Sequence, residues 1–390
     1  MIRAGRLTVG RILSAGIVGL GIVYATPEKV TVAQGQAAQA GVPTFEVDQS
    51  WPKTLPNNWM FGMIYAVAVD GHDHVWALQA PTGGPDGDTA AQIAAAQRGA
   101  APPVLEFDLE GNVARAWGGP GLGYNWPQEK TIKAYPVGIG GGEHGLFVDH
   151  KDNVWVAGSS HVLLKFSREG KFLLQLGELW KTNGSNDTKL LGNPTTVAVD
   201  PQTNEVFVAD GYVNHRIIVF DADTGAYKRH WGAYGKKPAE APAVAFDPNG
   251  PPPQYMWPVH CVRLAKDGLV YACDRQHSRL QVFRRDGTFV KEAFIDAKET
   301  PVIGPPYGNG QDIAFSADPE QRYLYFAGGV GKVWILRRSD LQILGTINDG
   351  GHYIAADSKG NLYTTTGSRT TRGPRRLLFK GVSATASGAR

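Results

Sequence analysis

The chain has 390 residues, enough for one large repeat domain or for two ordinary domains. Its 39 lysines and arginines nearly balance 36 aspartates and glutamates, which gives a net charge of +3, and no stripe dense in basic residues occurs. The charge pattern therefore argues against a nucleic-acid-binding protein.

The first 25 residues form the pattern of a secretory signal peptide. Arg3, Arg6 and Arg11 precede an uncharged apolar run over 12–25. This run is short for a membrane span, which needs about 20 apolar residues, although an uncleaved anchor remains the alternative. We therefore expect an exported protein, periplasmic or extracellular, with a signal peptide over 1–25 and no membrane association beyond a possible anchor. A flexible leader rich in Ala, Gln and Gly is expected over 26–42.

Two short strands around a polar turn recur six times along the chain. In the clearest copy, apolar residues 146–148 lead into a turn over 149–153, and 154–156 form the second strand. The first strands begin near residues 66, 146, 197, 262, 313 and 354. A second hairpin follows most copies. Four strands per repeat and six repeats predict a β-propeller, in which each blade buries its faces against its neighbours.

The sixth repeat lacks its fourth strand. Only one further apolar segment, 376–379, follows its inner hairpin, whereas the strand-like segment 44–47 near the N-terminus has no partner of its own. Adding that strand would complete the last sheet and remove an exposed edge. We therefore predict an all-β fold, a six-bladed β-propeller over 43–382 closed by an N-terminal strand, with a frayed tail over 383–390. A short helix is expected over 88–98.

One position of the repeat, directly before the first strand, carries most of the candidate chemistry, and we call it the axial position. In chain order it holds Tyr65, His144, Thr195, His260, Gln311 and His352. Histidine thus occupies every second repeat, and alternate blades of a sixfold ring lie one third of a turn apart. If this position faces the central channel, the three imidazoles meet on its axis. Three neutral histidines with an open fourth position are typical of catalytic zinc, whereas a lone histidine on a strand is more often structural.

Two further candidates follow the second strands of the third and fourth repeats. Tyr212 stands in the run Asp210-Gly-Tyr, and Arg275 follows Asp274. Both lie where loops leave the face that the histidines would occupy. A nearby divalent cation would favour the phenolate form of Tyr212, which could then act as a base, and Arg275 could bind a carboxylate. The alternative for each residue is that it packs against or caps a turn.

The two cysteines, Cys261 and Cys273, flank the turn 266–268 symmetrically. Symmetric pairing of this hairpin would place them opposite each other, at a separation that a disulfide can bridge after slight relaxation. An exported protein allows that bond. The alternative is two small buried side chains.

The run 206–217, Val-Phe-Val-Ala-Asp-Gly-Tyr-Val-Asn-His-Arg-Ile, resembles an NHL repeat and, more narrowly, the lyase domain of peptidyl-α-hydroxyglycine α-amidating enzymes. The resemblance covers roughly residues 60–370. It implies a six-bladed propeller with a central zinc held by three histidines, here matched by His144, His260 and His352. It further implies a catalytic tyrosine and an arginine, matched by Tyr212 and Arg275, and a structural calcium ion. The opening segment 45–52 is similar to a group of exported bacterial propeller proteins.

Two positions depart from the family pattern. The family has another arginine just after the second strand of the first repeat, where this chain has Gln79-Ala-Pro. This departure bears on the lyase reaction itself. The family also follows its last histidine with an aspartate that helps to bind calcium, where this chain has Tyr353. One carboxylate ligand is therefore missing from the implied calcium site, to which the Leu146 carbonyl could still contribute.

The resemblance, taken in full, implies a metal-dependent lyase that cleaves an N-acyl-α-hydroxyglycine-like small molecule or peptide to an amide and glyoxylate. A propeller lactonase or other metal-dependent hydrolase is an alternative class, but such enzymes usually bind calcium through carboxylates near the axis, and the six axial positions hold no acid. A non-enzymatic propeller that serves as a binding scaffold is the third hypothesis, because propellers host many functions.

Overall fold

The structure is a computed structural model. It describes residues 41–81, 88–128, 131–132, 139–140, 142–240, 246–298, 308–328, 331–365 and 373–383. The predicted signal peptide, the leader up to residue 40 and the tail from residue 384 lie outside the described residues. Within the described ranges, no helix combines the length and the apolar character needed to cross a bilayer.

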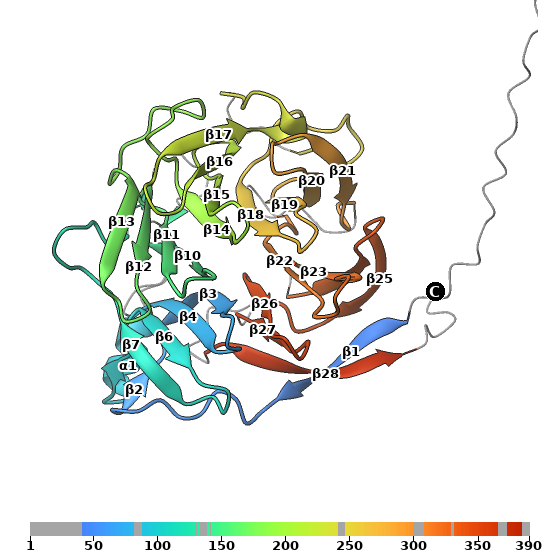
Figure 1. Cartoon of the computed structure of the whole chain (residues 1–390). Helices are drawn as coiled ribbons and strands as arrows, with labels where there is room; N and C mark the ends of the chain where they lie inside the picture. The colour runs from blue at the N-terminus through green and yellow to red at the C-terminus, as the bar shows by residue number, and fades with distance from the viewer. Residues whose placement is uncertain are drawn as a thin grey trace, which may run out of the picture. The chain divides into compact units, whose positions relative to one another are not determined.

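Six four-stranded antiparallel sheets are arranged as the blades of a propeller (Figure 1). In blades 1 to 3 the strands, from the innermost outward, are β3 (Met63–Val69), β4 (Val75–Ala80), β6 (Val104–Phe107) and β7 (Val113–Trp117); β10 (Glu143–Val148), β11 (Val154–Gly158), β12 (Val162–Phe166) and β13 (Phe172–Gly177); and β14 (Pro194–Asp200), β15 (Glu205–Asp210), β16 (Arg216–Asp221) and β17 (Tyr227–Trp231).

The other three blades follow the same order. Their strands are β18 (Val259–Leu264), β19 (Val270–Asp274), β20 (Arg279–Phe283) and β21 (Phe289–Phe294) in blade 4; β22 (Asp312–Phe315), β23 (Tyr323–Ala327), β24 (Val333–Arg337) and β25 (Gln342–Ile347) in blade 5; and β26 (Ile354–Ala356), β27 (Leu362–Thr364), β28 (Arg375–Ser383) and β1 (Val42–Asp48) in blade 6. The prediction of a six-bladed all-β propeller is confirmed.

Short helices and strands also form in the connections outside the blade sheets. The helix α1 (Asp88–Ala95) forms within the predicted range 88–98, between blades 1 and 2. Two-residue strands pair beside it and further along the same connection, and one 3₁₀ turn follows blade 3. These elements are β2 (Trp59–Met60) with β5 (Gly99–Ala100), β8 (Thr131–Ile132) with β9 (Ile139–Gly140), and η1 (Ala233–Gly235).

The N-terminal strand closes the ring, as predicted. β1 runs antiparallel to β28, with Phe45 opposite Phe379 and Val47 opposite Leu377, and the two strands lie side by side in Figure 1. The ring of Phe45 also meets Tyr325 of blade 5, at 5.5 Å between centroids. This strand therefore both completes blade 6 and packs against blade 5.

The core lies between neighbouring blades. The second and third strands of blade 2, β11 and β12, are buried at every residue, whereas its outermost strand β13 is mostly half-buried. At the far end of the inner strands, the indole N–H groups of Trp76 and Trp155 donate to the carboxylates of Asp70 and Asp149, both at 3.0 Å. The repeated apolar strands thus supply the contacts that one blade alone lacks.

Candidate metal centre

The axial residues lie at interruptions in the strand ladders. Between the first and second strands the register shifts at Tyr65, His144 and His260, and across Thr195 and its neighbour in blade 3. Such a β-bulge redirects a side chain that regular pairing would hold in the sheet. His352 stands two residues before β26. The side chains at these positions can therefore point away from the sheet of their own blade.

The structure brings the three predicted histidines together. His144, His260 and His352 come from blades 2, 4 and 6, and one ring nitrogen of each lies within 4.8 Å of the other two. The Nε2 atoms of His260 and His352 are 3.0 Å apart. Placement in alternate blades thus yields one cluster, although the chain separates its members widely.

Each imidazole is oriented by the axial residue of the next blade. Its Nδ1 lies against that residue's backbone carbonyl. The pairs are His144 with Thr195 (3.3 Å), His260 with Gln311 (2.6 Å) and His352 with Tyr65 (3.4 Å). Because a carbonyl only accepts, the proton resides on Nδ1 and the lone pair of Nε2 faces the cluster.

Tyr353 adds a hydroxyl to this arrangement. Its Oη lies 2.6 Å from His144 Nδ1 and 3.1 Å from the Thr195 carbonyl. With its proton on Nδ1, His144 can share this N–H between the phenol oxygen and the Thr195 carbonyl, while the phenol donates to the same carbonyl. Burial, and secondarily the nearby Asp312, raises the pKa of Tyr353 well above its usual value. The phenol therefore stays protonated, and position 353 offers calcium no carboxylate.

Burial keeps the three histidines neutral. It lowers the pKa of His144 to about 3, an effect that the hydrogen bond to Thr195 only partly offsets. Burial also lowers the pKa values of His260 and His352 well below the usual value, with the neighbouring histidines and Arg275 acting in the same direction. Neutral imidazoles are the form that binds metal.

The donor set fits a divalent transition metal. Two acceptor nitrogens 3.0 Å apart repel each other unless a cation or a proton lies between them. Three neutral imidazoles with their outer N–H groups fixed by carbonyls are the ligand shell typical of zinc sites that keep a fourth position open. Calcium prefers oxygen ligands, so three nitrogen donors do not form a typical calcium site.

Tyr212 lies at the edge of this cluster. Its Oη is 3.2 Å from Nε2 of His144 and 3.2 Å from Nε2 of His260. Arg275 donates from Nη1 to the same oxygen, at 2.9 Å. The two residues predicted from the second-strand ends are therefore in direct contact, and their contact point adjoins the nitrogens that could bind metal.

Two buried ion pairs hold the turns that carry Tyr212 and Arg275. Asp210 pairs with Arg216 at 2.9 Å, and the corresponding Asp274 pairs with Arg279 at 2.7 Å. In each case the aspartate ends the second strand and its register partner, the arginine, begins the third. Sequence reasoning did not assign these roles, although an Asp and an Arg bracketing the same turn in two repeats is a readable signal.

Further hydrogen bonds attach these aspartates to the loops. Asp274 accepts from the backbone N–H of Trp257 (2.9 Å) and lies 2.7 Å from His277 Nδ1. Burial opposes ionisation of Asp274, but His277 and Arg279 outweigh it and lower the pKa of this carboxyl. The buried carboxylate therefore remains charged and fixes the turn beside Arg275.

Gln79, at the position where the family has an arginine, is committed to the backbone. Its side chain is fully buried; Oε1 accepts from the Gly62 N–H (2.7 Å) and Nε2 donates to the carbonyl of Ala101 (2.9 Å). This residue holds the connection of blade 1 together and contributes no positive charge.

A second cluster of candidate ligands is filled by a guanidinium. Asp70, His74 and Glu106 approach one another at the blade 1 side of the interface with blade 2. Arg168 Nη2 lies among them, at 2.9 Å from Asp70 Oδ2 and bonded to Glu106. This cluster is an ion-pair network between blades, in which the guanidinium of Arg168 already balances negative charge of Asp70 and Glu106.

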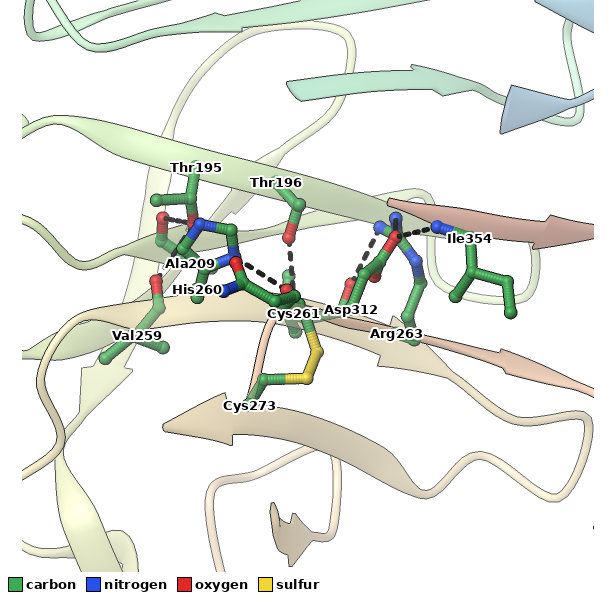
Figure 2. Close-up of a disulfide and its surroundings, with 12 residues drawn as sticks. Thr195, Thr196, Ala209, Val259, His260, Cys261, Arg263, Cys273, Asp312 and Ile354 are labelled. Atoms are coloured by element: carbon green, nitrogen blue, oxygen red, sulfur yellow. Dashed lines mark hydrogen bonds and ion pairs between the residues drawn. A yellow bond between two sulfur atoms is a disulfide. The ribbon is translucent and has the colours of Figure 1, made fainter. Parts of the chain in front are cut away.

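Cys261 and Cys273 form a disulfide between β18 and β19 (Figure 2). They are register partners, with Cα atoms 4.7 Å apart. Of the two sequence hypotheses, the cross-link is therefore correct. Figure 2 also shows that the bond follows His260 directly along β18.

Comparisons with known proteins agree with this architecture. The NHL repeat family model matches residues 191–220. Peptidyl-glycine alpha-amidating monooxygenase A of Xenopus laevis is 30% identical over 229 residues, 56% of this chain and 23% of the relative. A probable peptidyl-alpha-hydroxyglycine alpha-amidating lyase of Caenorhabditis elegans is 28% identical over 52% of each chain. NHL repeat-containing protein 3 of Mus musculus is 27% identical over 63% of this chain and 58% of its own.

The matched region thus spans about a quarter of the Xenopus relative and about half of the nematode one. The segment matched by the NHL model includes Tyr212 and the Asp210–Arg216 pair. This chain is a six-bladed β-propeller that contains a segment matching the NHL repeat and is similar over about half its length to proteins named as peptidyl-α-hydroxyglycine α-amidating lyases.

Proposed function

We propose that this protein is a metal-dependent carbon–nitrogen lyase acting on an N-acyl-α-hydroxyglycine-like small molecule or peptide. The observation that carries the proposal is the meeting of three neutral imidazoles with the Tyr212 hydroxyl, which Arg275 contacts. The names of the relatives supply the reaction class. Zinc is the proposed ion because of the three nitrogen donors.

A divalent ion held by Nε2 of His144, His260 and His352 would act as a Lewis acid that lowers the pKa of the substrate's α-hydroxyl. Tyr212, as phenolate, would accept the hydroxyl proton. The C–N bond then breaks, its electron pair passes to nitrogen, and nitrogen takes up a proton. The hydroxyl-bearing carbon becomes the aldehyde carbon of glyoxylate, so no water is consumed and no redox change occurs.

Arg275 would act mainly on Tyr212. Its Nη1 donates to the phenolic oxygen at 2.9 Å, and a hydrogen bond from a cation favours the charged form of an acceptor. We therefore assign Arg275 to stabilising the phenolate form of Tyr212 in the proposed reaction.

The test is a glyoxylate assay on purified full-length protein. With N-benzoyl-α-hydroxyglycine as substrate, we expect equal amounts of benzamide and glyoxylate, and about one zinc per chain by elemental analysis. His144→Ala should lose both metal and activity. The matched control is His150→Ala, since His150 is exposed on a turn and should keep both. Metal-loaded protein that releases no glyoxylate would refute the lyase proposal, and protein that binds no metal would favour the scaffold hypothesis.

We further propose that the protein is exported. The signal-like pattern over 1–25 supports this, as does the disulfide, because structural disulfides persist in oxidising compartments. Cell fractionation with N-terminal sequencing of the mature chain tests the proposal. A chain that stays in the reducing cytosol with residue 1 retained would contradict it.

A further inference from the structure

The disulfide joins two strand ends that each deliver a side chain to the metal centre. On β18, Cys261 directly follows His260, whose Nε2 lies 3.0 Å from His352 Nε2. On β19, Cys273 is followed by Asp274 and then by Arg275, which contacts Tyr212. The cross-link is therefore one residue from the candidate metal ligand His260 (Figure 2), and two residues along the chain from Arg275.

Other blades fill the same register position without a covalent bond. The corresponding pair is Ala66 with Leu78 in blade 1 and Gly145 with Ala157 in blade 2. In blade 3 the bulge spans two residues, and the corresponding positions hold Thr196 and Ala209. Apolar packing is thus sufficient for the blade fold at this point. A cross-link in blade 4 calls for a reason specific to that blade.

Blade 4 differs because its first two strands position two side chains at the candidate site. His260 occupies a bulge, outside the regular ladder between Val259 and Cys261. Arg275 stands in the turn after β19, held by its backbone N–H to the Pro258 carbonyl (3.1 Å). In blade 3, by contrast, the axial Thr195 hydroxyl lies against the backbone carbonyls of Ala209 and Val259, at 3.0 and 2.9 Å. Blade 4 therefore contributes both its axial side chain and its turn side chain to the site.

A metal centre requires its ligands to be held to within about 0.5 Å. A bulged residue is fixed less firmly than a residue paired on both sides. A covalent bond at the adjacent pair limits how far β18 can shift against β19. Both cysteines are fully buried, so the bond is shielded from reductants in solution and acts as a permanent constraint.

We propose that the Cys261–Cys273 disulfide is a positioning cross-link that keeps His260 and Arg275 in register with each other at the metal centre. This inference rests on the proposed metal-dependent function. It predicts that removing the bond changes the geometry of the bound metal and the turnover, beyond any general loss of stability.

The experiment compares two double variants with the wild-type protein. Cys261→Val/Cys273→Val replaces the bond with an apolar pair, as Ala66 and Leu78 form at this position in blade 1, and Cys261→Ala/Cys273→Ala is a smaller pair that serves if the valines do not fit. Each protein is stripped, reloaded with Co²⁺, and measured for its visible spectrum, its Co²⁺ affinity by chelator competition, and kcat and KM for N-benzoyl-α-hydroxyglycine. Leu105→Ala, a buried change in the third strand of blade 1, is the control for lost stability.

We expect the double variants to fold, with altered Co²⁺ absorption bands and about tenfold weaker Co²⁺ binding, the size of effect typical of groups that orient metal ligands. We also expect kcat to fall about tenfold with KM changed less than kcat. Leu105→Ala should lower the melting temperature while leaving the spectrum unchanged.

Double variants with the wild-type spectrum, affinity and kcat would overturn the inference and leave the bond a plain stabiliser. Wild-type protein that binds Co²⁺ but releases no glyoxylate would overturn the proposed reaction alone, and the spectra would still decide the role of the disulfide. Wild-type protein that binds no Co²⁺ would overturn both proposals.

Discussion

Tyr212 is the residue that accepts the proton in the proposed reaction. Its hydroxyl oxygen is shared by Nε2 of His144, Nε2 of His260 and Nη1 of Arg275, at 3.2, 3.2 and 2.9 Å. Its backbone carbonyl accepts from the indole N–H of Trp257 at 3.1 Å. Hydrogen bonds thus hold both the hydroxyl and the backbone of Tyr212, which keeps the hydroxyl beside the candidate metal ligands, as a general base requires.

Replacing Tyr212 with phenylalanine separates catalysis from metal binding. We expect kcat to fall by about 10²- to 10⁴-fold, the usual contribution of a general base, while the zinc content stays unchanged because the three imidazoles remain. Glyoxylate release and elemental analysis measure the two quantities. Tyr227→Phe, which removes a hydroxyl from a more exposed tyrosine, is the control. A Tyr212→Phe protein with normal kcat would show that another group takes the proton.

Asp274 gives a pH-dependent test of the turn that carries Arg275. Its pKa is lowered below 3.8 in the folded protein, since His277 and Arg279 outweigh the cost of burial. A carboxyl with a lowered folded-state pKa contributes stability that is present above about pH 4 and is lost as the pH falls through that lowered value. The ion pair therefore stabilises the protein at neutral pH and fails in acid.

Asp274→Asn should lower the free energy of unfolding at pH 7 by about 3 kcal/mol, because it leaves the guanidinium of Arg279 buried without its partner. The difference from wild type should shrink as the pH falls below about 4 and through the lowered pKa of Asp274, because the wild-type carboxyl then also takes up a proton. Urea unfolding at several pH values measures both effects. Asp286→Asn, on an exposed turn, should change little. A constant difference across this pH range would contradict the assignment.

At the scale of single residues, the sequence predicts which side chains converge better than it predicts which backbone groups they contact. The period of the repeats is enough to predict that His144, His260 and His352 converge. The carbonyls of Thr195 and Gln311 that orient two of these rings leave no trace in the sequence, because every residue carries a carbonyl. The cysteine pairing needed a register that composition cannot supply, so two hypotheses stayed open until β18 and β19 were paired.

Strands were predictable as elements because their patterns repeat. The closing strand β1 could be predicted from the strand that blade 6 lacked, and the pairing of Phe45 with Phe379 confirms it. The bulges could not be predicted, because a bulge is defined only relative to a partner strand. The helix α1 formed where an Asp-Thr start preceded alanines, in agreement with the prediction for 88–98.

Phe45→Ala tests how much the closing strand contributes. The Phe45 ring lies 5.5 Å from Tyr325 and 5.8 Å from Phe379 between centroids, and it is half-buried. Two aromatic contacts and partial burial amount to about 2 kcal/mol, so the free energy of unfolding should fall by about that much. Denaturant titration measures it. Leu109→Ala, at an exposed leucine, should cost under about 0.5 kcal/mol. An equal effect of both substitutions would mean that β1 adds little to closure.

An ion pair joins the inner strands of blades 4 and 5. Arg263, three residues after His260 on β18, donates to the carboxylate of Asp312 in blade 5 at 2.8 Å (Figure 2). It also donates to the Val197 carbonyl in blade 3 at 3.2 Å. Beyond it a cavity of about 350 Å³, lined largely by small apolar side chains such as Ala68, Ala198 and Ala314, opens at the ends of the inner strands. The pair thus lies on the wall between the metal centre and this cavity.

Blade 1 carries Ala66 and Ala68 at the positions that correspond to Asp312 and Arg263, which suggests a double substitution. Arg263→Ala alone should lower the free energy of unfolding by about 3–5 kcal/mol, because Asp312 stays buried without a cation. Arg263→Ala/Asp312→Ala should recover a large part of that loss. Urea unfolding of the four proteins of this cycle measures the coupling. Purely additive losses would show that the two charges do not depend on each other.

The ring as a whole was predictable, whereas its interior was not. Six repeats and one missing strand are enough to predict the propeller and its closure. Nothing in the repeat pattern predicts that Arg263 and Asp312 replace small residues and pair between the inner strands of blades 4 and 5. Such contacts join residues of different repeats, so they depend on side-chain length and on how closely neighbouring inner strands approach.

The closure of blade 6 has a consequence for biosynthesis. Since β1 can pair only with β28, and the histidines belong to blades 2, 4 and 6, a nascent chain that stops before the last blade has neither a sealed ring nor a complete set of nitrogen donors. On the proposed function, metal loading would then require translation to reach blade 6, and pairing of β1 would require the final strand β28; shorter products would remain open to proteases.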